Sequence, residues 1–174
     1  MSQSEPIDRS AFVDAYGDTS LELLNPGVTS HFIISAVLVS SEQVDEARSR
    51  AQEIHETLFG AEDATLSQLS DSDRLRCLAA IAPIPFRFRS VVVDKRAIDP
   101  RGGLQFHGSF SKFLHGVLFK RLFASSFRTR LIVDNTNRDE FMNGLRDYVE
   151  KRYQPDIFHR HPEFALALRK DEPL

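Results

Sequence analysis

The sequence predicts an α/β protein with a mixed five-stranded sheet and helices on both of its faces. Five stretches have the apolar, β-branched or alternating composition of strands. Four further segments carry apolar residues at helical spacing. Strands and helices alternate in the second half of the chain, which favours right-handed crossovers and parallel strands. Covering such apolar strands with helices on both sides is the economical way to bury them.

The first half of the chain supplies three strands and two helices. Strand 31–40 is apolar almost throughout, so we expect a central strand that is covered on both faces. Ser41 is the expected N-cap of the next helix, and Gly60 the residue that ends it. Strict alternation at the start of the third strand predicts one exposed face there. The expected elements are strand 11–16, strand 31–40, helix 41–59, helix 72–82 and strand 86–94.

The second half contributes two helices and two strands. Its longest helix has a wide apolar face, and a shorter alternating segment near the end reads as the last strand. The expected elements are helix 106–123, strand 130–134, helix 138–153 and strand 163–168. We expect the two helices of the first half to cover most of one face of the sheet, and these two helices to cover the other.

Composition describes one soluble domain. The chain has 174 residues, of which 41% are hydrophobic and 27% charged. Residues 1–9 are polar and are expected to be flexible, and residues 10–174 to form a single domain. The only cysteine, Cys77, excludes a disulfide within the chain. The longest apolar run, 32–39, is too short to span a bilayer, and the N-terminus lacks a signal-peptide core, which predicts a cytoplasmic protein with no membrane partner.

Charge is unevenly distributed along the chain. The formal net charge of -3 gives no overall attraction to nucleic acid. Segment 42–73 is mostly acidic, whereas segment 112–130 is basic. Two solvated helix faces explain this pattern most simply. The alternative is a basic face that holds the phosphate backbone of nucleic acid through Lys112, His115, Lys120 and Arg121.

Two predicted strands end in an aspartate. Asp14 follows the first strand run, and Asp134 follows the fourth. If these strands are parallel neighbours, both carboxylates lie at one edge of the sheet, as a divalent cation such as Mg²⁺ or Mn²⁺ requires. Asp18, in the turn after Gly17, is a third candidate ligand. The alternatives are a loop-satisfying carboxylate for Asp14, an ordinary turn residue for Asp18 and a helix cap for Asp134.

Several segments, in this order and spacing, resemble a known family. They are FVDAYGDT at 12–19, VVVDK at 91–95, FSKFLHGVLFKRLF at 110–123, LIVDN at 131–135 and FMNGLRDYVEK at 141–151. Through them the chain resembles the bacterial and phage domain-of-unknown-function family 3800. The resemblance covers nearly all of the chain and implies a ribonuclease H-like fold with a metal-dependent nuclease site.

The chain departs from that family at several acidic positions. The family opens with Asp-Glu-Ser-Gly-Asp, and here Ala15 and Tyr16 replace the Glu and Ser. Asn135 stands where an acidic residue commonly follows, and helix 106–123 contains no acid. The family also continues into a last helix beyond the point where this chain ends, at Leu174. The resemblance therefore implies the fold, but an incomplete set of catalytic carboxylates.

Two functions remain open at this point. The first is a metal-dependent phosphodiester hydrolase, with Asp14 and Asp134 as catalytic residues and Asp14, Asp18 and Asp134 around Mg²⁺ or Mn²⁺. The second is a non-catalytic binding or assembly module that keeps the same fold. The missing acids favour the second for this chain, whereas the resemblance favours the first for its relatives. Nucleic acid and a second copy of the chain are the expected partners.

Overall fold

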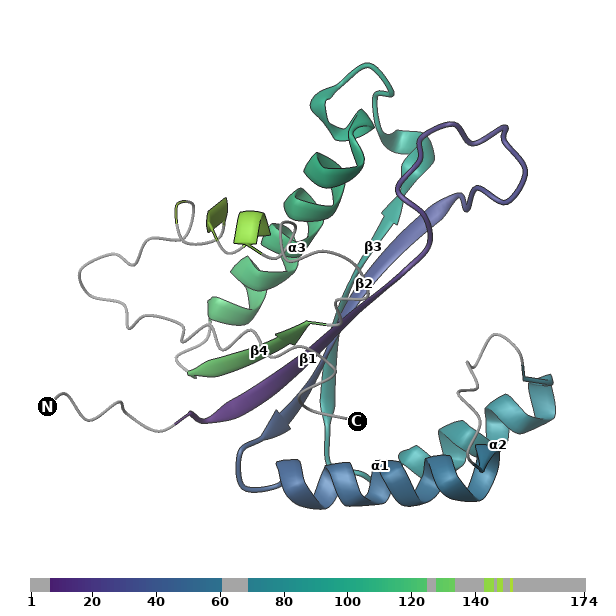
Figure 1. Cartoon of the computed structure of the whole chain (residues 1–174), viewed down its shortest axis with the longest axis vertical. Helices are drawn as coiled ribbons and strands as arrows, with labels where there is room; N and C mark the ends of the chain where they lie inside the picture. The colour runs from purple at the N-terminus through teal and green to yellow at the C-terminus, as the bar shows by residue number, and fades with distance from the viewer. Residues whose placement is uncertain are drawn as a thin grey trace, which may run out of the picture.

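A computed structural model describes residues 7–60, 69–124 and 128–133, together with helical residues at 143–145, 147–148 and 151. Within these ranges the chain forms a sheet flanked by helices (Figure 1). Short 3-10 turns at Lys95–Ala97 and Gly103–Gln105 precede the longest helix. The main elements are β1 (Arg9–Tyr16), β2 (His31–Ser40), α1 (Val44–Phe59), α2 (Asp71–Ile81), β3 (Arg87–Asp94), α3 (His107–Phe123) and β4 (Thr129–Val133).

The sheet is mixed, with the strand order β3-β2-β1-β4. β2 pairs antiparallel with both β1 and β3, and β4 pairs parallel with β1. The expectation that the first and fourth strands are parallel neighbours is thereby confirmed. Helix α3 connects β3 to β4, which run parallel in the sheet, and so forms the crossover between them. The predicted strand 163–168 lies outside the described residues, so the sheet described here has four strands.

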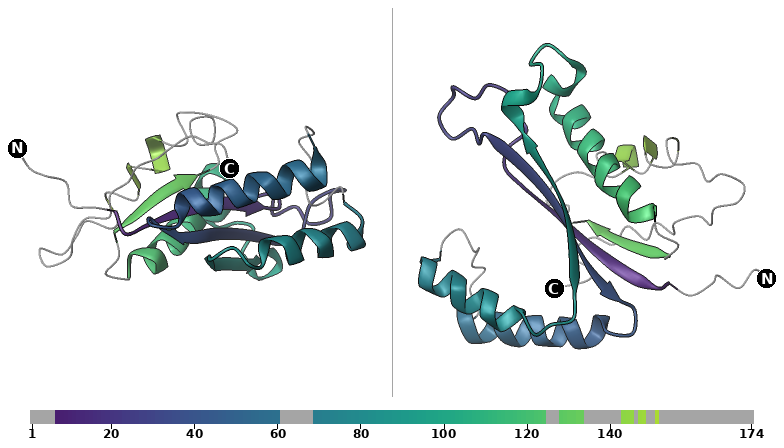
Figure 2. Two further views of the ribbon diagram at one scale, coloured as in Figure 1. Left: turned by 90° about the horizontal axis from the view of Figure 1, so that it is seen from below. Right: turned by 180° about the vertical axis from the view of Figure 1, so that it is seen from behind.

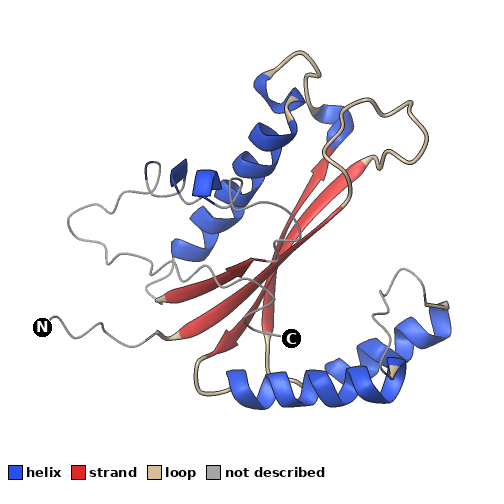
Figure 3. Ribbon diagram, in the orientation of Figure 1, coloured by secondary structure: helices blue, strands red, loops and turns tan. Residues whose placement is uncertain are grey.

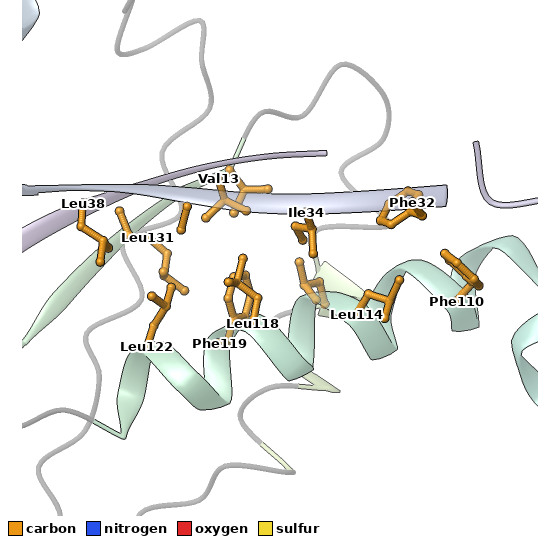
Figure 4. Close-up of a cluster of buried hydrophobic side chains, with 14 residues drawn as sticks. Val13, Phe32, Ile34, Leu38, Phe110, Leu114, Leu118, Phe119, Leu122 and Leu131 are labelled. Carbon is orange, nitrogen blue, oxygen red and sulfur yellow. The ribbon is translucent and has the colours of Figure 1, made fainter. Parts of the chain in front are cut away.

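Helix α3 covers one face of the sheet. Its sequence places large apolar residues three and four positions apart, so Phe110, Leu114, Leu118 and Leu122 form one buried stripe. The stripe packs against alternate residues of the strands (Figure 4). Phe32 of β2 meets Phe110 edge to face at 5.2 Å. Each such side chain contributes about 1.5–3 kcal/mol by leaving water, so this layer is the main core.

The helices α1 and α2 form a pair at one end of the sheet (Figures 1 and 3). They build a second, smaller core in which Val39 of β2, Ala47 of α1 and Ile84 are buried. Turned views show the pair extending past the strands and not lying flat on them (Figure 2). The expectation that these helices cover most of one face is therefore wrong, because their apolar stripes are used on each other and on the end of β2.

Large apolar side chains are exposed to solvent on the face of the sheet opposite α3. Val37 is 37% exposed, Phe88 69% and Val92 61%. Successive strand residues point to opposite faces, and the alternating partners Val91 and Val93 pack into the core under α3. We call the side that carries Val37, Phe88 and Val92 the open face.

The first residues of α1 and β1 differ from the predicted ones. Ser41 does not cap α1; its hydroxyl donates to the Ile7 carbonyl at 2.7 Å, and Gln43 takes the N-cap position without a side-chain bond. Arg9, expected in the flexible terminus, opens β1. Gly60 ends α1 with a positive φ of 66°, as predicted. Among the described residues, no helix is long and apolar enough to cross a bilayer.

Candidate metal-binding site at the ends of β1 and β4

The parallel register of β1 and β4 aligns the residues that directly precede the two predicted aspartates, Asp14 and Asp134. The last aligned pair is Val13 and Val133, and an aspartate follows each of them. Asp14 is exposed, and its Oδ1 accepts a hydrogen bond from the Ala15 amide at 2.7 Å. Because Val13 points into the core under α3, Asp14 points to the open face. Asp134 lies outside the described residues.

Two serine hydroxyls continue the row of Asp14 across the sheet. Asp14 aligns with Ser35 of β2, and Ser35 aligns with Ser90 of β3. The two hydroxyl oxygens are 2.7 Å apart, so one donates to the other. This row is a polar strip within an apolar face. Sequence reasoning missed it, although Ser35 interrupts an otherwise apolar stretch of its strand.

The carboxylate of Asp18 accepts hydrogen bonds that hold the loop after β1 in place. Its Oδ2 accepts the Thr29 amide at 2.7 Å and the Thr29 hydroxyl at 3.0 Å. Its Oδ1 accepts the Ser20 amide at 2.9 Å and the Lys95 ammonium at 3.2 Å. Burial opposes ionisation, but the hydrogen bonds from Thr29, Lys95 and Ser20 outweigh it and hold the Asp18 pKa well below its usual value.

These bonds correct the prediction that Asp18 is a metal ligand. A carboxylate has about four acceptor positions, and those of Asp18 are taken by protein donors. A cation at Asp18 would have to displace the ammonium of Lys95. The alternative of a turn residue, which bonds its own backbone two positions on, describes Asp18 better.

Lys95 is buried, a position that the sequence did not reveal. Its side chain is 0% exposed, and its ammonium donates to the carbonyls of Asp18 at 3.0 Å and Ser20 at 2.8 Å, besides the Asp18 carboxylate. Asp94 instead bonds Arg96 at 2.8 Å, and this pair lowers the pKa of Asp94 to about 2. The buried ammonium thus finds three acceptors and fixes the loop against the end of β3.

His115 is a core residue and not a phosphate contact. It is 6% exposed, and its ring lies edge-on to Phe119 at 5.7 Å. Nδ1 donates to the Ser111 carbonyl at 2.8 Å. Burial lowers the pKa of His115, which favours the uncharged ring. The prediction failed because the spacing of a histidine on a helix does not show which face the fold will cover.

The basic side chains lie away from Asp14. Lys112 is half-buried, whereas Lys120 and Arg121 are exposed near the C-terminal end of α3. Because α3 covers the face of the sheet opposite Asp14, these cations and Asp14 lie on different sides of it.

Two arginines from the sheet join the basic end of α3. Arg9 donates to the Leu122 carbonyl at 2.9 Å, and Arg89 donates to the Arg121 carbonyl at 3.2 Å. Both complement the partial negative charge at the helix C-terminus. Burial, followed by repulsion from Arg89, lowers the pKa of Arg9. Sequence reasoning missed these arginines because only the fold brings β1 and β3 to this helix end.

Within the described ranges, no three His, Cys, Asp or Glu side chains gather as a metal would require. Asp18 is held by protein donors, so Asp14 and Asp134 are the two predicted ligands on which the metal hypothesis now depends.

Comparison with known proteins identifies the fold. A chain in the structure of the PCNA:RNase HII complex from Archaeoglobus fulgidus is similar to this one, with a TM-score of 0.51 and 15% identity. The similarity covers 80% of this chain and 58% of that chain. It is a similarity to RNase HII, so the fold is ribonuclease H-like. No family model and no curated protein sequence matches the chain.

Proposed function

We propose that this chain is a divergent member of domain-of-unknown-function family 3800 and a metal-dependent phosphodiester hydrolase of low activity. Asp14 and Asp134 would hold one Mg²⁺ or Mn²⁺. The parallel register that ends in Val13 and Val133 carries this proposal, because it aligns the two residues that directly precede Asp14 and Asp134. The ribonuclease H-like fold supports it at the level of architecture.

Asp14 fits the role of a ligand for a hard cation. Its carboxylate is exposed, and among the described residues only the Ala15 amide bonds it, through Oδ1. A bound cation would act as a Lewis acid on a phosphoryl oxygen. The hydroxyl of Ser35, the neighbour of Asp14 in the row, would offer a hydrogen bond to the same phosphate. Two carboxylates give a weaker site than the three or more of a two-metal nuclease, hence the low activity.

A non-catalytic binding or assembly module is the second candidate. The hydrogen bonds that Lys95 and Thr29 donate to the Asp18 carboxylate favour this second candidate, because they occupy one of the three expected metal ligands. Ala15 in place of an acid and the absence of acids from α3 point the same way.

Cleavage assays with the full chain separate the two. Single- and double-stranded DNA, RNA and a hybrid duplex are incubated with Mg²⁺ or Mn²⁺, and Asp14→Asn and Asp134→Asn are compared with Asp45→Asn. Asp45 is an exposed carboxylate on the remote helix α1 and serves as the matched control. We expect slow cleavage that Asp14→Asn and Asp134→Asn each abolish and Asp45→Asn leaves unchanged. No cleavage together with no Mn²⁺ binding would establish the non-catalytic reading.

A further inference from the structure

The open face combines exposed apolar side chains with a strand that lies at the edge of the described sheet. β3 stands at the end of the strand order, and among the described residues it pairs with β2 alone. Its eight residues contain no proline. The exposed residues Phe88 and Val92 belong to this strand. An unpaired apolar edge of this length is a template for a further strand.

The chemistry of this region indicates a protein partner. β2 and β3 contribute three uncharged pairs to the open face: Val37 with Phe88, Ser35 with Ser90, and Ile33 with Val92. Depletion of charge is typical of the centre of a protein–protein interface. A phosphate backbone laid along the β2–β3 edge would instead require cations there, and β2 and β3 turn no lysine or arginine to the open face, because Arg87 and Arg89 align with the core residues Leu38 and Ala36.

We propose that β3 pairs antiparallel with β3 of a second copy, about a two-fold axis at Ser90. In this register Phe88 of each copy lies opposite Val92 of the other, so the same apolar pair forms twice. A two-fold axis perpendicular to the sheet keeps the open faces of both copies on one side. The result is one continuous sheet through the dimer.

The neighbouring registers are less favourable. Pairing about Arg89 would place Arg89 against itself in the second copy, and like charges directly opposite are destabilising. Pairing about Val91 would place Phe88 opposite Asp94 and Arg87 opposite Lys95. The register about Ser90 is therefore the most favourable of the three. Because β3 is complementary to itself in this register, a second copy of the chain is the partner that we propose.

The topology leaves room for this pairing. The α1–α2 pair connects the end of β2 to the start of β3, so it lies at one end of the edge strand (Figure 1). In an antiparallel partner the corresponding helices lie at the opposite end. The row of Asp14, Ser35 and Ser90 then continues into its counterpart, with the two Asp14 residues five strand spacings, or about 24 Å, apart. The inference goes beyond the proposed function, since pairing does not depend on catalysis.

Cross-linking tests the register. Ser90→Cys is made in a Cys77→Ala background, and Ser35→Cys in the same background is the matched control. At the axis, opposite Cβ atoms are about 4.5–5.5 Å apart, close to disulfide range, whereas the Ser35 pair would be three spacings, or about 14 Å, apart. We expect Ser90→Cys to give a covalent dimer on oxidation and Ser35→Cys to stay unlinked. Equal linking of both variants, or of neither, overturns the register.

Light scattering tests the association itself. We expect the wild type to have twice the 19.8 kDa mass of one chain at micromolar concentration. Val92→Lys should weaken the dimer by about tenfold or more, because it places two charges in the paired strands. Leu24→Lys, at a loop residue that is 100% exposed, should not change it. A wild type that is monomeric at all concentrations, or a Val92→Lys dimer as tight as the wild type, overturns the proposal.

Discussion

Lys95 carries a charge into the interior and has three oxygen acceptors there. Removing the ammonium would leave the Asp18 carboxylate and the carbonyls of Asp18 and Ser20 short of a donor. Unsatisfied buried acceptors and broken buried pairs are costly, so we expect Lys95→Met to lower the free energy of unfolding by about 2–4 kcal/mol. Urea denaturation at neutral pH measures this. Arg96→Met, which breaks an exposed pair with Asp94, should cause a much smaller loss; equal losses would contradict a special role for Lys95.

The lowered pKa of Asp18 leads to a prediction for how the free energy of unfolding changes at acidic pH. Its pKa is lower in the folded chain than its ordinary value of 3.8, so the unfolded chain binds the proton more readily. Its contribution is therefore complete above the ordinary value and is lost as pH falls through and below it. We expect Asp18→Asn to be less stable than the wild type at pH 7, and this difference to shrink as pH is lowered through 3.8 and below. A constant difference from neutral to acidic pH, in denaturant titrations, would exclude the carboxylate as its cause.

His115 was misplaced by sequence reasoning and the burial of Lys95 was missed, both for one physical cause. Both residues are polar, and polar residues are usually at the surface. Whether such a residue is buried depends on acceptors that the fold brings from far away in the chain. Lys95 meets a loop about eighty positions earlier, and no local pattern encodes that contact. Asp14 was expected just after its strand, but it lies within β1, one position beyond the last residue that aligns with β4.

The turn after β1 depends on a glycine for two reasons. Gly17 has a φ of 99°, and a Cβ there would be 2.7 Å from the His31 carbonyl and 2.9 Å from the Thr29 hydroxyl. Gly27 has a similar φ of 83° but open space around it, so it is a matched control. We expect Gly27→Ala to cost about 1–2 kcal/mol from backbone strain alone, and Gly17→Ala to cost about 3 kcal/mol or more. Thermal and urea unfolding would contradict this if the two losses are equal.

Element types and most boundaries were predictable because periodicity and end signals are local. The longest helix was expected over 106–123 and occupies His107–Phe123. The cap at Ser41 failed, because the serine hydroxyl bonds the Ile7 carbonyl instead. In β3, alternation showed that Phe88 and Arg89 point to opposite faces, but not which face α3 covers. Register with β2 decides this, and it places Val91 and Val93 under the helix.

At the level of the whole molecule, the parallel placement of the first and fourth strands was expected from the aspartate that follows each apolar run. The position of the α1–α2 pair was not. Apolar stripes show that these helices bury a face, and they do so against each other and the end of β2. Figure 2 shows the consequence, a helical pair at the end of the sheet. The two faces of the sheet are thus unequal in burial, although the strand sequences are apolar on both.

This inequality predicts opposite effects for two phenylalanines. Phe110 is 0% exposed beneath the sheet, so Phe110→Ala should lower the free energy of unfolding by about 3–5 kcal/mol through lost contacts and a cavity. Phe88 is 69% exposed, so Phe88→Ala should cost less than about 1 kcal/mol in the monomer. Urea unfolding must be measured at a concentration below dimerisation, because association adds to apparent stability. Phe88→Ala should, by contrast, weaken self-association, whereas Phe110→Ala should spare it wherever the chain stays folded. A loss for Phe88→Ala as large as that for Phe110→Ala would mean that Phe88 is buried within the monomer, and the open face would no longer be available to a partner.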